Sequence, residues 1–332
     1  MSKPTLSVIM PNYNYSKYIG EALDALFAQT YSPMEVIICD DGSTDSSVEI
    51  INEYIKRYPG IKFMRNEKNM GGLYTVNKCL EIATGDYVYY IASDDKILPG
   101  FFEKAMNLLI KYPKAGLCFG DYAILEGKRR IENKLYLADK PSYFSPVEFF
   151  KLLQRTEFTV IAGISVVVKR AALIEAGGFL PEIKWSSDIF AHHVIGFRYG
   201  VCYLPEITGL MRKHDIQYTA KHKRPLALEL EVIKDTMDIV LRPQYSDVRD
   251  KFMKTAPFAH CTWDILKLAI FNKKYRGFFS FKLLRYAFFD KFVRRGLLRI
   301  LPLNTWRVIL NNYKRVKLVV NKLIRGRNAL NG

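Results

Sequence analysis

The chain has 332 residues, of which 49% are hydrophobic and 14% aromatic. This composition excludes an intrinsically disordered chain, and the length predicts one large domain with an appendage. The net charge of +17 is unevenly distributed, because residues 267–332 hold 17 Lys and Arg against the single acid Asp290, whereas the preceding residues are almost neutral. We therefore expect a neutral globular part followed by a basic tail.

The cysteines and the apolar segments bear on the compartment. Five cysteines without CxxC spacing predict reduced core thiols in a cytoplasmic protein, rather than a disulfide framework or a zinc site. The N-terminal residues have no signal-peptide core. No apolar run reaches the roughly 18 to 20 residues that a membrane-spanning helix needs. We expect a cytoplasmic protein that is not integral to a membrane.

Strands and helices alternate through the first part of the chain. Apolar runs predict strands over residues 6–10, 35–39 and 61–64, and a buried central strand that starts at Tyr87 and stops at Asp94 and Asp95. Apolar residues at helical spacing predict helices over 18–29, 46–58 and 73–83. This alternation predicts mostly parallel pairing in a doubly wound α/β sheet flanked by helices.

The same approach gives a coarser prediction for the rest of the chain. We expect helices over 100–111 and 170–176 and after Asp188, strands over 115–120, 163–168 and 203–206, and a long loop or hairpin over 125–140. Beyond Tyr218 the pattern becomes helical, with helices over 226–241 and 248–271.

Pairs of acids follow two of the predicted strands. Asp40 and Asp41 follow the second strand, and Asp94 and Asp95 follow the central one. In open α/β sheets the ligand crevice lies beyond the carboxyl ends of the strands, and a divalent cation makes two neighbouring carboxylates tolerable. Gly42–Asp45, which opens the next helix, suits a nucleotide or another anionic ligand. The alternative is that Ser93, Asp94 and Asp95 merely cap a helix.

Four motifs carry a resemblance to a known family. Pro11–Asn14, Asp40–Asp45, Asn69–Gly72 and Ser93–Asp95, in this order and at these separations, resemble the family 2 glycosyltransferases with the GT-A fold, over roughly residues 5–215. The resemblance implies a Rossmann-like catalytic domain, which we place at residues 1–218. It also implies an inverting, metal-dependent transferase that takes a sugar from a nucleotide diphosphate donor, and a UDP-sugar is the donor that we expect. The acceptor would be a glycan or a lipid-linked saccharide in cell-surface polysaccharide synthesis.

The resemblance also implies roles for individual residues. The donor would be bound by Pro11, Asn12, Tyr13, Asp40, Asp41, Gly71 and Asp94. Asp95 would hold a divalent metal, Mg or Mn, and His214 would be a second metal ligand or a diphosphate contact. Ala92 and Val76 replace an acid and an arginine that many members carry, which leaves open a catalytically inactive sugar-nucleotide-binding or scaffold protein. A nucleotidyltransferase would need a glycine-rich signature after the first strand, where this chain has Pro11–Asn14.

Asp188 is the candidate general base. A carboxylate near apolar neighbours such as Trp185 can have a raised pKa suited to taking the proton from an acceptor hydroxyl. The resemblance supports this role, because Asp188 falls where the family has an acidic motif just before a helix. The alternative role is a helix N-cap, which Ser186, Ser187 or Asp188 could provide.

The C-terminal extension, residues 219–332, interleaves basic and bulky apolar residues. In residues 278–289 phenylalanines and leucines are interrupted by cations, a pattern typical of a helix lying in a membrane interface. Nucleic-acid binding is the rival interpretation, and a helical bundle packed on the catalytic domain is a third. Since the apolar content exceeds what base stacking needs, we expect peripheral attachment to the inner face of the cell membrane and no nucleic acid.

Overall fold

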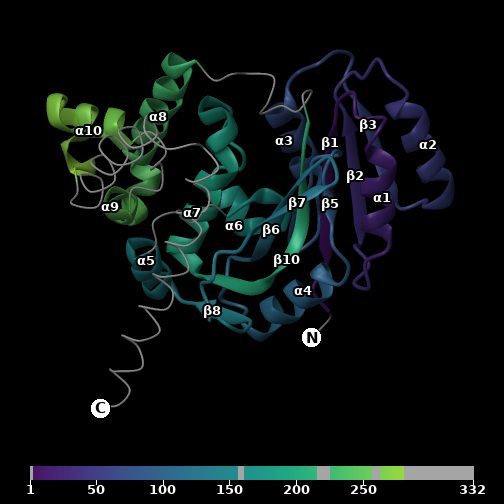
Figure 1. The fold of residues 1–332 in the computed structure, drawn as a ribbon, viewed down its shortest axis with the longest axis horizontal. Helices are drawn as coiled ribbons and strands as arrows, with labels where there is room; N and C mark the ends of the chain where they lie inside the picture. The colour runs from purple at the N-terminus through teal and green to yellow at the C-terminus, as the bar shows by residue number, and fades with distance from the viewer. Residues whose placement is uncertain (1–2, 156–160, 215–224, 256–261, 280–332) are drawn as a thin grey trace. The chain divides into compact units, whose positions relative to one another are not determined.

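The computed structural model describes residues 3–155, 161–214, 225–255 and 262–279 (Figure 1). The chain divides into two compact units, Met1–Pro257 and Phe258–Gly332. The first part contains β1 Leu6–Asn12, α1 Ile19–Phe27, β2 Glu35–Asp40, α2 Ser47–Arg57, β3 Ile61–Arg65, α3 Gly72–Ile82, β4 Tyr87–Tyr90, β5 Lys96–Ile97 and α4 Phe101–Lys111.

The chain continues with a second group of elements. These are β6 Leu117–Glu126, β7 Arg129–Asn133, β8 Ser142–Phe144, α5 Pro146–Arg155, η1 Gly163–Ser165, β9 Val166–Lys169, α6 Arg170–Glu175, η2 Pro181–Ser186, α7 Ser187–Tyr199, β10 Val201–Lys213, α8 Leu226–Val240, η3 Pro243–Tyr245 and α9 Ser246–Thr255. Within the second unit, the described residues form α10 Thr262–Phe271 and η5 Lys273–Phe278.

The described strands form one sheet with the order β3-β2-β1-β4-β9-β6-β10-β5, and β7 and β8 join it beside β6 and β10. The predicted α/β sheet flanked by helices is confirmed, but its pairing is mixed. β3, β2, β1 and β4 are parallel, as are β6 and β10, whereas β9 runs antiparallel to both β4 and β6. The alternation of strands and helices holds best before β4, and this is where the pairing is parallel.

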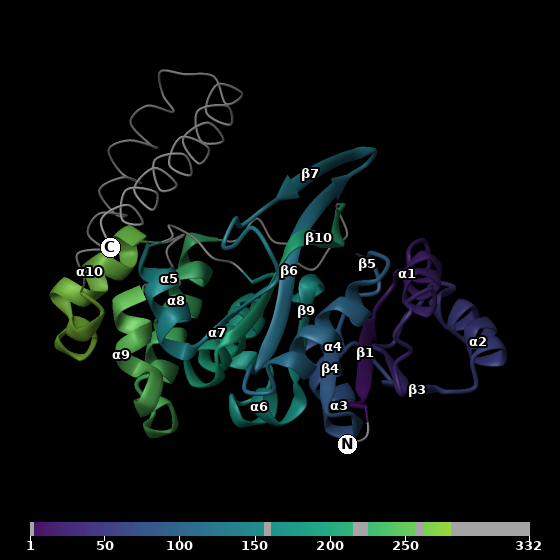
Figure 2. The same cartoon turned by 90° about the horizontal axis from the view of Figure 1, so that it is seen from below.

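The expected element bounds mostly agree with the structure. Ile19, Ala22, Leu23 and Leu26 form the buried face of α1, as their helical spacing predicts. The segment expected as a loop or hairpin is the β6–β7 hairpin, which Figure 2 shows as two strands lying side by side. Several strand bounds differ from expectation. β9 begins only at Val166, after η1, and β10 continues to Lys213. β1 continues through Pro11, and β4 ends at Tyr90.

The differences at the ends of β1 and β4 have one geometric cause. β4 pairs with β1 only as far as Ile9 and Tyr90, so Pro11, which has no N–H to donate, lies beyond that ladder. The Ile91 amide still donates to the Ile9 carbonyl of β1, but residues 92–95 leave the sheet, and the Asp95 amide donates to the Ala92 carbonyl at 3.1 Å. Asp94 and Asp95 therefore lie in a turn after the strand and not directly at its end.

The first unit extends past the predicted domain end at residue 218. α8 packs on η2, and α9 packs on α5 and α7, so these helices belong to the compact unit that ends at Pro257. Cys39, Cys79, Cys118 and Cys202 are buried free thiols, as expected, and Cys261 lies outside the described residues. None of the described helices is long and apolar enough to cross a membrane. The predicted interfacial helices after residue 279 also lie outside the described residues.

Candidate active site

Asn12, the last residue of β1, connects the loops that follow β2 and β4. Its Nδ2 donates to Asp40 Oδ2 at 2.8 Å and to Ser43 Oγ at 3.2 Å, and its Oδ1 accepts from Ser93 Oγ at 2.7 Å. The side chain is 2% exposed. Because β1 lies between β2 and β4 in a parallel sheet, these contacts join three strand ends at one edge. The structure thus brings together the motifs that the sequence only placed in order.

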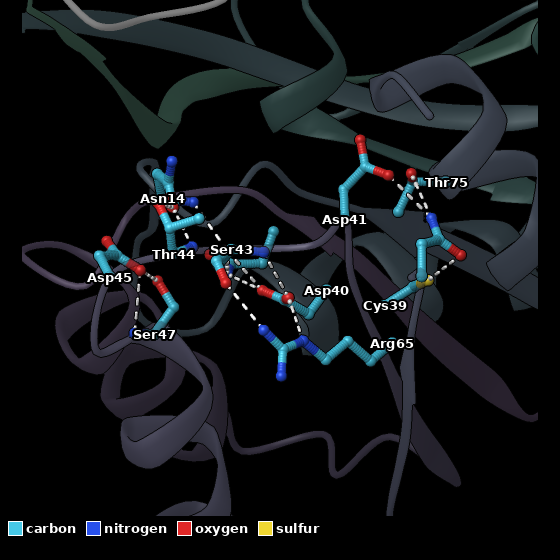
Figure 3. A network of polar contacts seen from close by, with 12 residues as sticks. Asn14, Cys39, Asp40, Asp41, Ser43, Thr44, Asp45, Ser47, Arg65 and Thr75 are labelled. Atoms are coloured by element: carbon cyan, nitrogen blue, oxygen red, sulfur yellow. Dashed lines mark hydrogen bonds and ion pairs between the residues drawn. The ribbon is translucent and has the colours of Figure 1, made fainter. Parts of the chain in front are cut away.

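Asp40 is fully buried and accepts several hydrogen bonds (Figure 3). The Ser43 amide donates to its Oδ1 at 2.8 Å and the Ser43 hydroxyl to its Oδ2 at 2.6 Å, while Arg65 Nε lies 3.4 Å from Oδ1. Gly42, which lies between Asp40 and Ser43 in the chain, has a φ of +76°, and a Cβ there would come within 2.8 Å of the Lys68 backbone. Only glycine allows this approach, so the loop after β2 has a fixed shape.

Asp41 points away from Asp40, toward Thr75, as Figure 3 shows. Its Oδ1 accepts from Asn66 Nδ2 and from the Met70 amide, both at 2.8 Å, and its Oδ2 accepts from the Gly71 amide at 2.9 Å. Both carboxylate oxygens therefore hold the loop between β3 and α3. This role had no signal in the sequence, because the partners lie 25 to 30 residues away.

Gly71, which immediately precedes α3, lies beside a cavity of about 540 Å³. The cavity is lined by Met70, Gly71, Gly72, Leu73, Tyr74, Asn77, Lys78, Glu81, Pro181 and Lys184. Gly71 has a φ of +95°, and a Cβ there would meet no atom within 4 Å. Glycine is therefore needed at this position for its backbone conformation and not for lack of space. The positive φ, which other residues rarely adopt, turns the chain into the helix.

The acids after β4 meet the end of β10. His214 Nε2 lies 2.9 Å from Asp94 Oδ2, the Arg212 amide donates to Asp95 Oδ1 at 2.8 Å, and Arg212 Nε donates to the Asp94 carbonyl at 2.9 Å. The His214 ring stacks on Tyr18 with centroids 4.7 Å apart. Arg212 is the first residue of the Arg-x-His motif that ends at His214, but the sequence predicted no role for its own side chain.

Burial dominates the electrostatics of this acid pair. It raises the pKa of Asp95 well above its ordinary value, and the neighbouring charge of Asp94 raises it further. Burial also raises the pKa of Asp94, whereas His214 opposes that shift. Each shift means that the site lacks the positive charge needed to hold two buried carboxylates in their ionised form.

A divalent metal would fit this deficit. In the neutral tautomer that donates its Nε2 proton to Asp94, the lone pair of His214 is on Nδ1, which is buried and has no hydrogen-bond partner among the described residues. A carboxylate oxygen and an imidazole nitrogen are suitable ligands for Mg or Mn. Within the described ranges, however, no group of three or more His, Cys, Asp or Glu side chains could hold an ion by itself. Oxygen atoms of a bound substrate would be suitable further ligands.

Asp188 lies in the first turn of α7 and is half-buried. Ser186 is the residue that precedes the helix, so Asp188 is not its N-cap, and Asp188 Oδ1 accepts from the adjacent Ile189 amide at 2.7 Å. Burial raises the pKa of Asp188 to about 6. Tyr90 has its pKa raised first by burial and then by the charge of Asp188. Asp188 therefore lies close to the end of β4.

Pro11 and Tyr13 occupy the β1 end of this edge. Both are half-buried beside Asn12, and Pro11 pairs in register with Cys39 of β2. Together the described residues form an acidic edge at the carboxyl ends of the parallel strands, which is where open α/β sheets bind their ligands.

Comparison with known proteins identifies the family. Residues 7–172 match the model of glycosyl transferase family 2, so the chain belongs to this family. An uncharacterized glycosyltransferase of Haemophilus influenzae is 33% identical over 52% of this chain and 65% of its own length. TuaG of Bacillus subtilis, assigned by its name to teichuronic acid biosynthesis, is 37% identical over 33% of this chain and 43% of its own length. In both relatives the match spans less than two thirds of the protein.

The fold has solved counterparts. The crystal structure of S. aureus TarS 1-349 in complex with UDP-GlcNAc resembles the chain with a TM-score of 0.61, covering 88% of this chain and 92% of that one. The sequence identity is 17%, so the likeness concerns the fold alone. It confirms the predicted GT-A architecture.

Proposed function

We propose that the protein is a glycosyltransferase that moves a sugar from a nucleotide diphosphate donor, a UDP-sugar, to a glycan or lipid-linked saccharide in cell-surface polysaccharide synthesis. The observation that carries the proposal is the joining of three strand ends through Asn12, Asp40 and Ser93, next to Asp94 and Asp95. The presence of UDP-GlcNAc in the TarS structure and the naming of TuaG support the donor class and the process.

The donor would lie along this edge. Asn12 and Asp40 would contact the base beside Pro11 and Tyr13, and Asp94 the ribose or sugar. The loop that Asp41 holds, ending at Gly71, would form the far wall of the donor site. Asp95, with His214, would hold Mg or Mn together with the diphosphate. When bound, the metal offsets the charge that develops on the departing nucleoside diphosphate.

Asp188 would act as the general base of a single displacement. The acceptor oxygen attacks the anomeric carbon and gives its proton to the Asp188 carboxylate, while the bond from that carbon to the diphosphate oxygen breaks. With a pKa of about 6, the carboxyl is mostly ionised at neutral pH and still basic enough for proton transfer. Attack from the face opposite the leaving group inverts the configuration, so an α-linked donor gives a β-linked product.

The acceptor and the location form a separate part of the proposal. We propose attachment to the inner face of the cell membrane, because the sequence from residue 267 carries a net charge of +16 among bulky apolar residues. Full-length protein should sediment with vesicles that contain anionic lipid at low salt and should be released as salt is raised. Sedimentation that is independent of anionic lipid would contradict this part alone.

The test of the reaction is a panel of radiolabelled nucleotide sugars incubated with the protein and Mn²⁺. Release of the nucleoside diphosphate, or transfer to an acceptor, identifies the donor. Tight binding of a nucleotide sugar without release or transfer would instead support the inactive scaffold that Ala92 and Val76 suggest. If no nucleotide sugar is bound, hydrolysed or transferred, the proposal is wrong.

A further inference from the structure

A partly buried hydrogen bond connects the strand that leads to Asp94 and Asp95 with the helix that carries Asp188. Tyr90 is the last residue of β4, and His192 lies one helical turn after Asp188 on α7. The Tyr90 hydroxyl lies 2.8 Å from His192 Nε2, although the two residues are 102 positions apart. Residues four apart on a helix share a face, so His192 and Asp188 both lie on the side of α7 that meets this strand.

The direction of this hydrogen bond follows from the other ring nitrogen. His192 Nδ1 lies 3.1 Å from the Ile161 carbonyl, which can only accept, so Nδ1 carries the proton. His192 is fully buried, and burial lowers its pKa to about 3, which keeps the ring neutral. Nε2 is then the acceptor and Tyr90 the donor. The hydrogen bond therefore has a single direction, from the Tyr90 hydroxyl to His192 Nε2.

The Tyr90 ring is also held in place by packing. The ring meets Phe179 edge to face at 4.8 Å. A Cβ at Gly163 would come within 2.6 Å of the ring, so the backbone approaches it as closely as glycine allows. Tyr90 thus contacts the backbone before β9, the segment before η2 and the helix α7. Three segments that follow β8 in the chain therefore meet at this side chain.

We propose that Tyr90 is a positioning residue that, through its hydrogen bond to His192, sets the place of Asp188 relative to Asp94 and Asp95. The inference rests on the proposed function, because the geometry between base and donor matters only if Asp188 accepts a proton. Tyr90 itself holds the first turns of α7 and transfers no proton. Misplacement of a reacting group by about 1 Å can cost roughly 100-fold in rate, so one such hydrogen bond can control turnover.

The test compares Tyr90→Phe with Tyr89→Phe. Tyr89 is the neighbouring residue of β4, is fully buried and donates to the Ile164 carbonyl at 2.9 Å, so its variant also loses one hydrogen bond but none to α7. Tyr90→Phe should lower kcat roughly tenfold or more with an unchanged donor KM. Tyr89→Phe should keep kcat within about twofold, because it lowers only stability.

Hydrogen exchange provides a readout that does not depend on activity. In Tyr90→Phe the amides of residues 191–194 should exchange about fivefold faster, whereas Tyr89→Phe should leave them unchanged. Unchanged exchange in Tyr90→Phe overturns the proposal even if the protein transfers no sugar. Faster exchange with unchanged kcat also overturns it, because α7 would then be held by Tyr90 without consequence for the reaction. A wild-type protein without turnover counts against the proposed function instead.

His192→Leu removes the acceptor from the other side of the same hydrogen bond. Because both substitutions break one bond, the double variant should lose no more than about twofold in kcat beyond either single variant. Fully multiplicative losses would show that Tyr90 and His192 act independently, which contradicts the proposal.

Discussion

Two pairs of neighbouring acids lie at the ends of parallel strands of the same sheet, but their surroundings differ. Asp40 and Asp41, after β2, accept hydrogen bonds from backbone amides, side-chain amides and a hydroxyl, and Arg65 lies beside Asp40. Asp94 and Asp95, after β4, have raised pKa values because burial outweighs their partners. The first pair has enough donors to hold the loops in place, whereas the second is short of positive charge, as a metal site is before the ion binds.

The largest difference should appear when Asp95 loses its charge. Asp95→Asn should abolish sugar transfer, because the proposed metal loses its main ligand, while the fold remains intact. Removing a carboxylate from a crowded buried pair relieves repulsion, so the unfolding free energy should not fall. Turnover at saturating donor and Mn²⁺, together with urea unfolding, measures both. Full activity under those conditions would remove the metal from the mechanism.

Asp188 shares the raised pKa of the second pair but lies on another element. Asp188→Asn should reduce kcat by roughly 10²- to 10⁴-fold, the usual contribution of a general base, with little change in donor affinity. Steady-state kinetics and donor titration separate the two quantities. If affinity collapses and turnover of the bound donor survives, Asp188 binds the substrate and is not the base.

Asp41 belongs to the first pair, which holds the loops in place, so its substitution should affect stability. Asp41→Ala removes the acceptor of the Met70 amide and one of the two acceptors of both the Gly71 amide and Asn66 Nδ2, and it should lower the unfolding free energy by about 2 to 4 kcal/mol. Asp41→Asn, which keeps one oxygen, should lose less. Urea denaturation of both variants beside Asp95→Asn provides the measurement. Equal stability of Asp41→Ala and wild type would mean that the loop needs no acceptor there.

The pH dependence should be the smallest effect. The pKa of folded Asp188, about 6, lies above its ordinary value of 3.8, so the folded state binds this proton first as the pH falls. This carboxyl therefore favours folding below pH 6, and that contribution is lost as the pH rises through 6. Turnover should change in the opposite direction and rise through about pH 6 as the base ionises. A flat kcat profile between about pH 5 and 7 would contradict the assignment.

How much of the fold and the site could be predicted depends on how far apart in the sequence the interacting residues lie. Local patterns predicted the strand that leads into Asp40, the amphipathic helix α1 and the acids after β4. The antiparallel direction of β9 was not predictable, because pairing direction depends on the path of the chain and not on periodicity. The partners of Asp41 and the bond from Tyr90 to His192 connect positions 25 to 102 residues apart, which no local pattern reveals.

The most direct test of the central claim is a crystal structure with UDP and Mn²⁺, using the anomalous signal of manganese to locate the ion. We predict manganese bound to Asp95 and to the diphosphate, with the uracil beside Asp40 at the ends of β1 and β2. Binding of UDP away from these strand ends, or manganese on the diphosphate without contact to Asp95, would contradict the account.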